Sequence, residues 1–356
     1  MKKRWFFVTA VGLLAAYAFA PRPAPELPMT QSHHGQQGFI NPGQAKLNKS
    51  LLLYTKMRVT TPHPNQRDNL HHVPVVATEL TALQQPLDAP RATWIGHSTV
   101  LLQHAGKNVL TDPMFSKRAS PSQLIGPGRY FAPSVALNDL PKIDAVVISH
   151  NHYDHMDKSS IKHIANQPGW NTQWYVPLEN ARYLESFGVS RSNIHQLDWW
   201  ESVSLGDVTF TATPSQHWSK RTAWDTNYAL WSAWAIDMGG WKVWFGGDTG
   251  YHPQHFAETG KRLGPFDLGI IPIGAYNPQW FMGPMHINPE EAVQIHREVR
   301  AKQSFAVHWG TFQLTAEPVH EPAERLRAAT ENMTEGDFVT LAIGETKTFS
   351  IIERQK

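Results

Sequence analysis

The sequence contains no cysteine. A chain without cysteine has no disulfide, no thiolate metal ligand, no cysteine nucleophile and no lipid-modified cysteine. A site for a borderline metal would therefore consist of histidine and carboxylate side chains alone. The absence leaves the redox compartment open, because a cysteine-free chain is stable in oxidising and reducing surroundings alike.

Charge is also scarce, with 17% charged residues among 356 and a net charge of +2 when histidine is neutral. A nucleic-acid-binding protein would need a basic surface, so we expect no nucleic-acid partner. Hydrophobic residues make up 41% of the chain, which is enough for a well-filled core. Tryptophan is frequent, at 14 residues. Its rings serve in cores and in contacts with lipid or bulky apolar substrates.

The apolar run at residues 5–20 is short for a bilayer span but has the length of a signal-peptide core, and basic residues precede it. Ala18-Phe19-Ala20 has the form of a cleavage site, although Pro21 directly after it is unfavourable for processing. Cleavage after Ala18, or an uncleaved anchor, are the alternatives, and a buried apolar helix is a third. We expect residues 1–20 to be a signal peptide or an N-terminal membrane anchor. The protein would then be exported or anchored, in a bacterial periplasm or cell envelope.

The composition and pattern of the sequence predict three further segments. Residues 21–50 are rich in Pro, Gln, Gly and His without a period, which predicts a linker. The histidine pair of "SHHGQQG" within it receives no metal assignment, because we expect no ordered scaffold around it. Residues 51–90 predict an N-terminal extension that wraps the core, and residues 91–356 predict one large mixed α/β domain.

Local patterns predict the elements of this domain. Strands are expected to pair as hairpins early and to alternate with helices late. One hairpin is predicted to turn at Gly239-Gly240. Asp157 is placed to cap the helix that begins directly after it. "IDAVVISH" has the nearly continuous apolar character of a strand buried on both faces.

Potential metal ligands follow the ends of four predicted strands. The stretch "SHNHYDHMD" holds the first four, and three more lie downstream; together they are His150, His152, Asp154, His155, His217, Asp248 and His308. Chance clustering among 19 histidines is the alternative. Strand ends are rigid, so side chains there can be held in a fixed geometry. The recurrence at four strand ends favours a site.

Imidazole and carboxylate suit Zn²⁺, with Fe or Mn as alternatives. Seven ligands exceed what one catalytic zinc uses, because such a zinc takes three protein ligands and a water. Seven fit two metal ions that share one carboxylate. Such a pair can hold a hydroxide between them as a nucleophile.

"HNHYDH" is similar to the H-x-H-x-D-H signature of the metallo-β-lactamase superfamily, and the three downstream ligands match its later motifs in order. The resemblance implies an αββα sandwich, an α/β fold of four layers with the metals at one edge of the two sheets. It further implies that His150, His152 and His217 hold one zinc. Asp154, His155 and His308 would hold the other, with Asp248 between them and Asp154 also serving catalysis.

Longer stretches, among them "TWIGHSTVLLQ", "TDPMFSKRASP", "FGGDTGYHP" and "GAYNPQWFMGPMHINPEEAVQIH", resemble the N-acylphosphatidylethanolamine-hydrolysing phospholipase D family and its bacterial members over residues 91–315. The resemblance implies hydrolysis of a phosphodiester, with phosphatidic acid and an N-acylethanolamine as products. The alternatives are a hydrolase of the same fold acting on a small molecule, such as the ascorbate-6-phosphate lactonase relatives, and a non-catalytic membrane-associated protein. A phospholipid or a small phosphorylated substrate and a membrane surface are the expected partners. Homodimer formation stays open.

Candidate substrate residues surround this motif. His286 is a candidate to protonate the leaving group or to bind phosphate, with capping of the next helix as the alternative. Tyr153 and Met285 are candidates for substrate contact, with loop packing and core packing as alternatives. His97 and Asp112 follow strand ends near the same edge and are candidates to orient the ligand histidines. Capping of a turn before Pro113 is the alternative for Asp112.

Overall fold

The computed structural model describes residues 24–25, 29–43, 51–85, 89–334 and 336–352. The predicted signal peptide or anchor at residues 1–20 lies outside these described residues. Among the helices of the described ranges, none combines the length and the apolar character that crossing a membrane requires.

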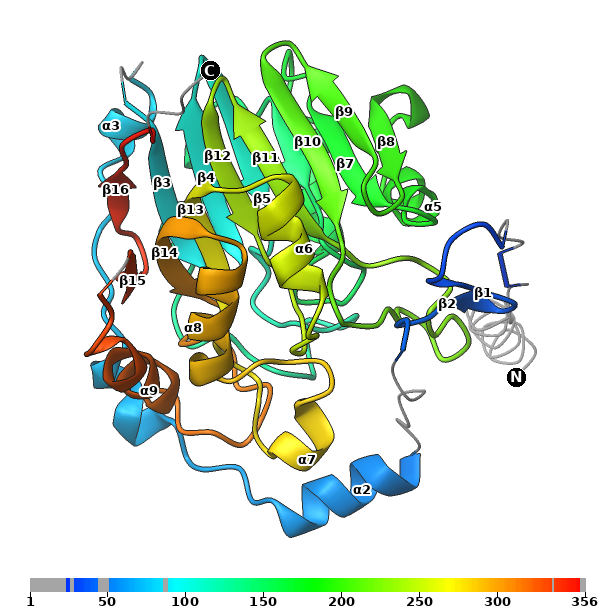
Figure 1. Ribbon diagram of the computed structural model, residues 1–356, viewed down its shortest axis with the longest axis vertical. Coiled ribbons are helices and arrows are strands. Elements are labelled where there is room, and N and C mark those ends of the chain that lie inside the picture. The colour runs from blue at the N-terminus through cyan, green and yellow to red at the C-terminus, as the bar shows by residue number, and fades with distance from the viewer. Residues whose placement is uncertain (1–23, 26–28, 44–50, 86–88, 335, 353–356) are drawn as a thin grey trace, which may run out of the picture.

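Two seven-stranded sheets form the centre of the molecule (Figure 1). The first has the order β16 (Thr346–Thr348), β3 (Arg91–Gly96), β4 (Thr99–His104), β5 (Lys107–Thr111), β6 (Ala145–Val147), β7 (Gln173–Pro177) and β8 (Ile194–Leu197). The second has the order β15 (Asp337–Thr340), β14 (Ala301–Val307), β13 (Phe266–Pro272), β12 (Trp241–Phe245), β11 (Ala233–Met238), β10 (Val208–Thr213) and β9 (Ser202–Leu205).

Both sheets share one plan, in which antiparallel hairpins are followed by parallel strands. In the first sheet β3, β4 and β5 pair antiparallel, and β5 to β8 pair parallel. In the second, β9 to β12 are antiparallel and β12 to β15 are parallel. The hairpin at Gly239-Gly240 is confirmed, since it joins β11 to β12. Hairpins therefore occur early in each half of the chain; the sequence predicted them early in the whole chain and, in addition, at Gly239-Gly240.

The faces of the strands explain the layers. In β4, Val100 and Leu102 belong to the core that includes the second sheet, whereas Leu101 points to the opposite core. This alternation is the two-residue period of a strand with both faces buried. Helices α4 (Lys158–Ala165) and α5 (Ala181–Ser186) cover the outer face of the first sheet. Helices α6 (His255–Arg262), α8 (Pro289–Glu298) and α9 (Glu321–Thr330) cover the second (Figure 1). The predicted αββα sandwich is confirmed.

Helix caps fix where the loops near the sheet edge end. Asp157 accepts hydrogen bonds from the backbone N–H groups of Ser159 and Ser160, so its predicted capping of α4 is confirmed. Helix α8 begins with a capping box between Asn288 and Glu291. His286 is therefore not the cap of this helix, which removes the structural alternative for that residue.

The N-terminal part of the described chain packs along the sandwich. Its elements are β1 (His34–Gly35), β2 (Gly38–Phe39), α2 (Leu51–Thr60), η1 (Arg67–His72) and α3 (Leu80–Leu83), and the remaining short elements are η2 (Leu137–Asp139), η3 (Arg191–Asn193) and α7 (Gln279–Met282). Residues 29–43, here called the N-terminal strap, carry the β1–β2 pair. The backbone N–H of Phe39 donates to Asn227 O at 2.8 Å. This stretch lies within the predicted linker at residues 21–50, and its described part forms the β1–β2 pair with hydrogen bonds to the domain.

Candidate metal centre

The predicted ligands meet at one edge of the sandwich because each follows a strand that ends there. The "HNHYDH" loop leaves β6 of the first sheet, while His217, Asp248 and His308 follow β10, β12 and β14 of the second. All seven lie within one network of contacts, so the structure brings together residues that are up to 158 positions apart.

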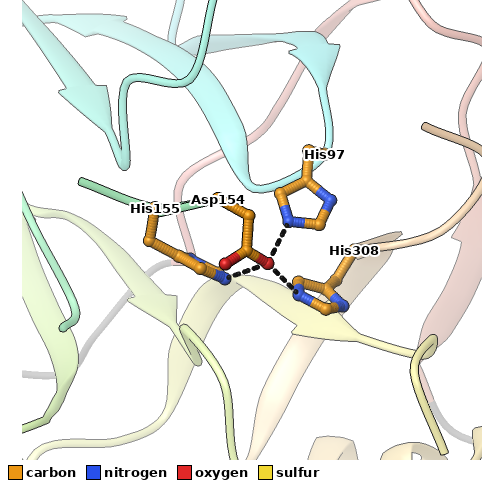
Figure 2. Close-up of side chains that lie close together, drawn as sticks. All are labelled: His97, Asp154, His155 and His308. Carbon is orange, nitrogen blue, oxygen red and sulfur yellow. Dashed lines mark hydrogen bonds and ion pairs between the residues drawn. The ribbon is translucent and has the colours of Figure 1, made fainter. Parts of the chain in front are cut away.

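The first group surrounds Asp154 (Figure 2). Its Oδ2 lies 3.0 Å from Nε2 of His97, 3.4 Å from Nε2 of His155 and 3.5 Å from Nε2 of His308. His97 comes from the turn between β3 and β4, and its carbonyl oxygen accepts from the backbone N–H of His308 at 3.1 Å. His97 was expected to orient a ligand, and it lies among the ligand atoms themselves.

The second group consists of His150, His152 and His217. Nδ1 of His152 lies 2.8 Å from Nε2 of His150 and 3.2 Å from Nε2 of His217. Ring nitrogens at these separations can converge on one cation. The set is the one that the resemblance assigned to one metal.

Asp248 lies between the two groups. Its Oδ2 is 3.2 Å from Nε2 of His155 and 3.7 Å from Nε2 of His217, whereas Oδ1 is 3.1 Å from Nε2 of His308. Oδ2 thus faces histidines of both groups, whereas Oδ1 faces His308 of the first group. Gly247 permits this approach: it has φ +57°, and a Cβ there would lie 2.5 Å from Cβ of Ser149.

Polar contacts outside the cluster fix the rings. Asp112 Oδ2 lies 2.7 Å from Nδ1 of His155, and Oδ1 accepts from the backbone N–H of Ser149 at 2.7 Å. Nδ1 of His217 lies 2.9 Å from Met285 O. Each contact with a ring occupies Nδ1 and leaves Nε2 directed into the cluster, which is how ligand histidines are oriented in metal sites. Asp112 does not cap the turn before Pro113; it is held by Ser149 and His155.

Burial and charge act against each other at the carboxylates. Burial favours the neutral acid, but the surrounding imidazoles, His155 foremost, outweigh it and hold the pKa of Asp154 and of Asp248 well below the ordinary value. Burial lowers the pKa of His150 and of His217 well below 6.5, so both rings are neutral. The carboxylates, Asp248 foremost, outweigh burial and raise the pKa of His155 well above 6.5 and that of His308 to about 9, so these two rings hold protons that metal binding would release.

Several of these atoms are buried without a hydrogen bond, namely Nε2 of His155, Nε2 of His308 and Oδ1 of Asp248. Both ring nitrogens lie at ion-pair distances of 3.1–3.2 Å from the Asp248 carboxylate, and a buried polar atom with an unmet hydrogen bond costs about 1–3 kcal/mol. These three atoms lie close together, so one cation bound among them would satisfy all three and remove this cost. The donor set therefore fits a bound metal.

Backbone strain concentrates at the same edge. His97, Asp112 and His308 have φ values of 54°, 31° and 63°, although none is glycine. Such conformations cost on the order of 1–3 kcal/mol each and persist where the surrounding structure over-determines them. The rest of the fold thus holds these side chains in place.

A cavity of about 910 Å³ opens over the cluster. Asp154 and Asp248 lie at its base, and its walls include Tyr54, Phe281 and Met282. Tyr153, Met285 and His286, the predicted substrate residues, also line it. A cavity of this size with apolar walls and a few polar groups is typical of a binding site for an organic ligand.

The three predicted substrate residues differ in their contacts. Nδ1 of His286 lies 3.8 Å from Asp248 Oδ2, and burial lowers the pKa of His286 to about 3. Tyr153 donates to Arg221 O at 2.7 Å, so its hydroxyl also packs the loop. Met285 is 1% exposed, and its carbonyl oxygen is the one that orients His217.

Arg221 is a residue of the site that no sequence pattern pointed to. Its Nη1 donates to Asn151 O at 2.9 Å and to Met156 O at 2.8 Å, and its guanidinium lies 4.2 Å from the centre of the Tyr153 ring. It thus braces both sides of the "HNHYDH" loop and lines the cavity. No local pattern marks it, because its role depends on tertiary contacts with a loop about 70 residues earlier in the chain.

Comparison with known proteins fits this geometry. Residues 107–309 match the family described as beta-lactamase superfamily domain. The chain belongs to the metallo-β-lactamase superfamily. Within that superfamily it is 42% identical to N-acyl-phosphatidylethanolamine-hydrolyzing phospholipase D 1 of Caenorhabditis elegans, over 71% of this chain and 74% of the nematode protein. The chain is therefore a member of the N-acylphosphatidylethanolamine-hydrolysing phospholipase D-like family.

A second curated relative and a solved structure are also similar to this chain. The mitochondrial N-acyl-phosphatidylethanolamine-hydrolyzing phospholipase D of Saccharomyces cerevisiae is 34% identical, over 73% of this chain and 55% of the yeast protein. The solved isothiocyanate hydrolase from Delia radicum gut bacteria is 22% identical, covers 72% of this chain and 98% of its own, and has a TM-score of 0.57. At that identity the structure shows the shared fold alone. As a member of this superfamily with an intact ligand cluster, the chain is a metal-dependent hydrolase.

Proposed function

We propose that this metallo-β-lactamase superfamily member is a dinuclear zinc phosphodiesterase of the phospholipase D type, acting on N-acylphosphatidylethanolamine or a related phospholipid. The observation that carries the proposal is the cavity of about 910 Å³, which joins the ligand cluster at its base to largely apolar walls. A phosphodiester with long acyl chains needs both. The names of the nematode and yeast relatives point to the same substrate class.

In this proposal the ligand roles follow the two groups. His150, His152 and His217 would hold one zinc, and Asp154, His155 and His308 would hold the other, with Asp248 and His97 as neighbouring ligand-type residues. When bound, the metal ions supply Lewis acidity, which activates a water and neutralises phosphate oxygens. Asp112 keeps Nδ1 of His155 occupied, so that Nε2 stays directed at the metal.

The remaining residues bind and position the lipid. His286 stands at the base of the cavity beside Asp248, where an imidazole N–H can donate to a phosphate oxygen or to the departing alcohol oxygen. The wall formed by Phe281, Met282 and Met285 offers aromatic and polarizable surface to an acyl chain. Hydrolysis breaks the bond between phosphorus and the ethanolamine oxygen. The oxygen of water enters phosphatidic acid, and the N-acylethanolamine leaves with the proton.

The rim of the cavity supports a lipid surface as the partner. Each of four segments that line the cavity also carries an exposed apolar side chain, namely Leu52 (78% exposed), Leu124 (87%), Trp224 (51%) and Trp280 (52%). Helices α2 and α7 lie together at the lower end of Figure 1, and Nζ of Lys56 sits 5.5 Å from the centre of the Trp280 ring. Apolar side chains with a nearby cation are suited to the headgroup boundary of a bilayer.

The decisive experiment offers zinc-loaded protein a panel of vesicles in ¹⁸O-labelled water, with N-acylphosphatidylethanolamine, phosphatidylcholine or phosphatidylethanolamine, and a phosphorylated lactone in parallel. We expect phosphatidic acid carrying one ¹⁸O from the N-acylated lipid. Protein with the substitution Asp248→Ala is the control and should release none. Opening of the lactone with all lipids intact would instead identify a small-molecule hydrolase.

A further inference from the structure

A second group of buried ligand-type side chains joins the N-terminal strap to the catalytic domain. Nε2 of His33 lies 2.5 Å from Oδ1 of Asp198, and Nε2 of His34 lies 2.8 Å from Oδ2 of the same carboxylate. The three residues are only 3%, 4% and 8% exposed. We propose that they form a zinc site, separate from the catalytic centre, that fastens the strap to the domain.

The donor set has the chemistry of zinc. Two imidazole nitrogens and a carboxylate are ligands that Zn²⁺ takes at about 2.0–2.2 Å, which puts ligand atoms roughly 3–3.5 Å apart in a tetrahedron. The three donor atoms lie within 4.8 Å of one another, so small rotations bring them to that spacing. A water completes the fourth position. Burial disfavours the charged form of Asp198, but the contact with His33 outweighs it and lowers the pKa of that carboxyl.

The group is also held in place from outside. The ring of His33 stacks on Trp199 with 4.1 Å between ring centres, and Trp199 Nε1 donates to Trp231 O at 2.8 Å. The backbone N–H of Asp198 donates to Oε2 of Glu201 at 2.8 Å. Rigid supports of this kind keep ligand atoms converged, which lowers the entropic cost of binding an ion.

The position of the strap gives the site a role. Asn41 Nδ2 donates to His217 O at 2.8 Å, and a Cβ at Gly38 would lie 2.2 Å from Asn227 O. The strap therefore presses against residues 217–228, a segment that includes a proposed catalytic ligand and part of the cavity wall. A zinc ion bound by the strap would therefore stabilise the position of residues 217–228 in the cavity wall.

The test counts metal in full-length protein. Wild type, the double variant His33→Ala/His34→Ala and the control His71→Ala/His72→Ala are loaded with Zn²⁺, dialysed and analysed by inductively coupled plasma mass spectrometry. The control pair is also adjacent in sequence but exposed, on η1. We expect the His33/His34 variant to hold one zinc fewer per chain than wild type, and the control to match wild type. Equal zinc in all three would overturn the proposal.

This difference does not depend on how many ions the catalytic centre binds, so it stands apart from the proposed phospholipase activity. Asp198→Asn separates metal binding from hydrogen bonding, because asparagine keeps an acceptor but loses the charge. We expect it to lose the same single zinc. Should the variants fail to fold, anomalous scattering from wild-type crystals grown with zinc decides: a peak between His33, His34 and Asp198 supports the site, and none refutes it.

Discussion

Asp112 illustrates how one side chain outside the ligand set can control a metal centre. It is fully buried, and its carboxylate accepts from Ser149 while Oδ2 contacts Nδ1 of His155. If Asp112 loses its charge, His155 loses the partner that fixes its ring and its proton. The effect should therefore appear in metal affinity before it appears in the fold.

For Asp112→Asn we expect zinc affinity to fall about 10- to 100-fold, the range seen when such orienting partners are removed. Competitive titration with a zinc-sensitive chelator measures it. Asp139→Asn is a matched control, because Asp139 is exposed in η2 and should leave the affinity unchanged. Unchanged affinity in Asp112→Asn would show that His155 needs no orienting partner.

His286 allows a sharper separation of chemistry from binding. Its ring faces Asp248 and the cavity, while capping of α8 belongs to Asn288. We expect His286→Ala to lower kcat about 100-fold or more, as loss of a positioned acid or hydrogen-bond donor does, with zinc content unchanged. His163→Ala on α4 serves as the comparison. Full activity with the alanine in place would remove His286 from the reaction.

At the scale of elements, the loops around the cavity decide how the substrate is reached. Leu124 and Ile125 are 87% and 72% exposed in a loop whose other members, Ala119 and Pro121, line the cavity. A loop that shows apolar side chains to solvent on one side of a binding cavity is suited to insertion into a lipid surface.

The double variant Leu124→Glu/Ile125→Glu should bind vesicles about tenfold or more weakly, because each apolar side chain contributes roughly 1.5–3 kcal/mol when buried. Vesicle sedimentation measures the binding, and hydrolysis of a short-chain, water-soluble substrate should stay at the wild-type rate. The control is Val75→Glu/Val76→Glu, on exposed valines that do not line the cavity. Equal sedimentation of both variants would argue against this loop as the lipid contact.

The sequence predicted these elements to different degrees. The ligand motifs were visible because each follows an apolar strand, and the resemblance of "HNHYDH" supplied their grouping. The strap was not visible, because "SHHGQQG" has no period and its partner Asp198 lies 165 positions after His33. Arg221 was missed for the same reason. Contacts made by irregular loops depend on the finished fold and leave no local pattern.

At the scale of the whole molecule, buried histidines limit stability in acid. His296 on α8 is 2% exposed, its Nδ1 contacts Ser304 Oγ at 2.7 Å, and burial lowers its pKa to about 4. In the unfolded chain its pKa would be near 6.5, so the unfolded state binds more protons between these values. Its contribution to stability is therefore complete above pH 6.5 and is lost as the pH falls toward 4.

We expect His296→Gln to lose less stability than wild type between pH 7 and 4.5, by on the order of 2–3 kcal/mol. Urea unfolding at both pH values measures the difference. The matched comparison is His195→Gln on β8, a half-buried histidine whose pKa burial also lowers, so its effect should have the same sign. The same acid-induced loss in His296→Gln and wild type would contradict the assignment.

The two sheets repeat one plan, and the ligands come from both halves. His150, His152, Asp154 and His155 belong to the half that ends with β8, whereas His217, Asp248 and His308 belong to the half that begins with β9. A metal bound there would thus link the two halves of the chain. When the protein is stretched from both ends in an optical trap, we expect a single rupture with zinc and two smaller ones at lower force after chelation. Rupture in one step under both conditions would show that sheet packing and the pairing of β16 with β3 join the halves without the metal.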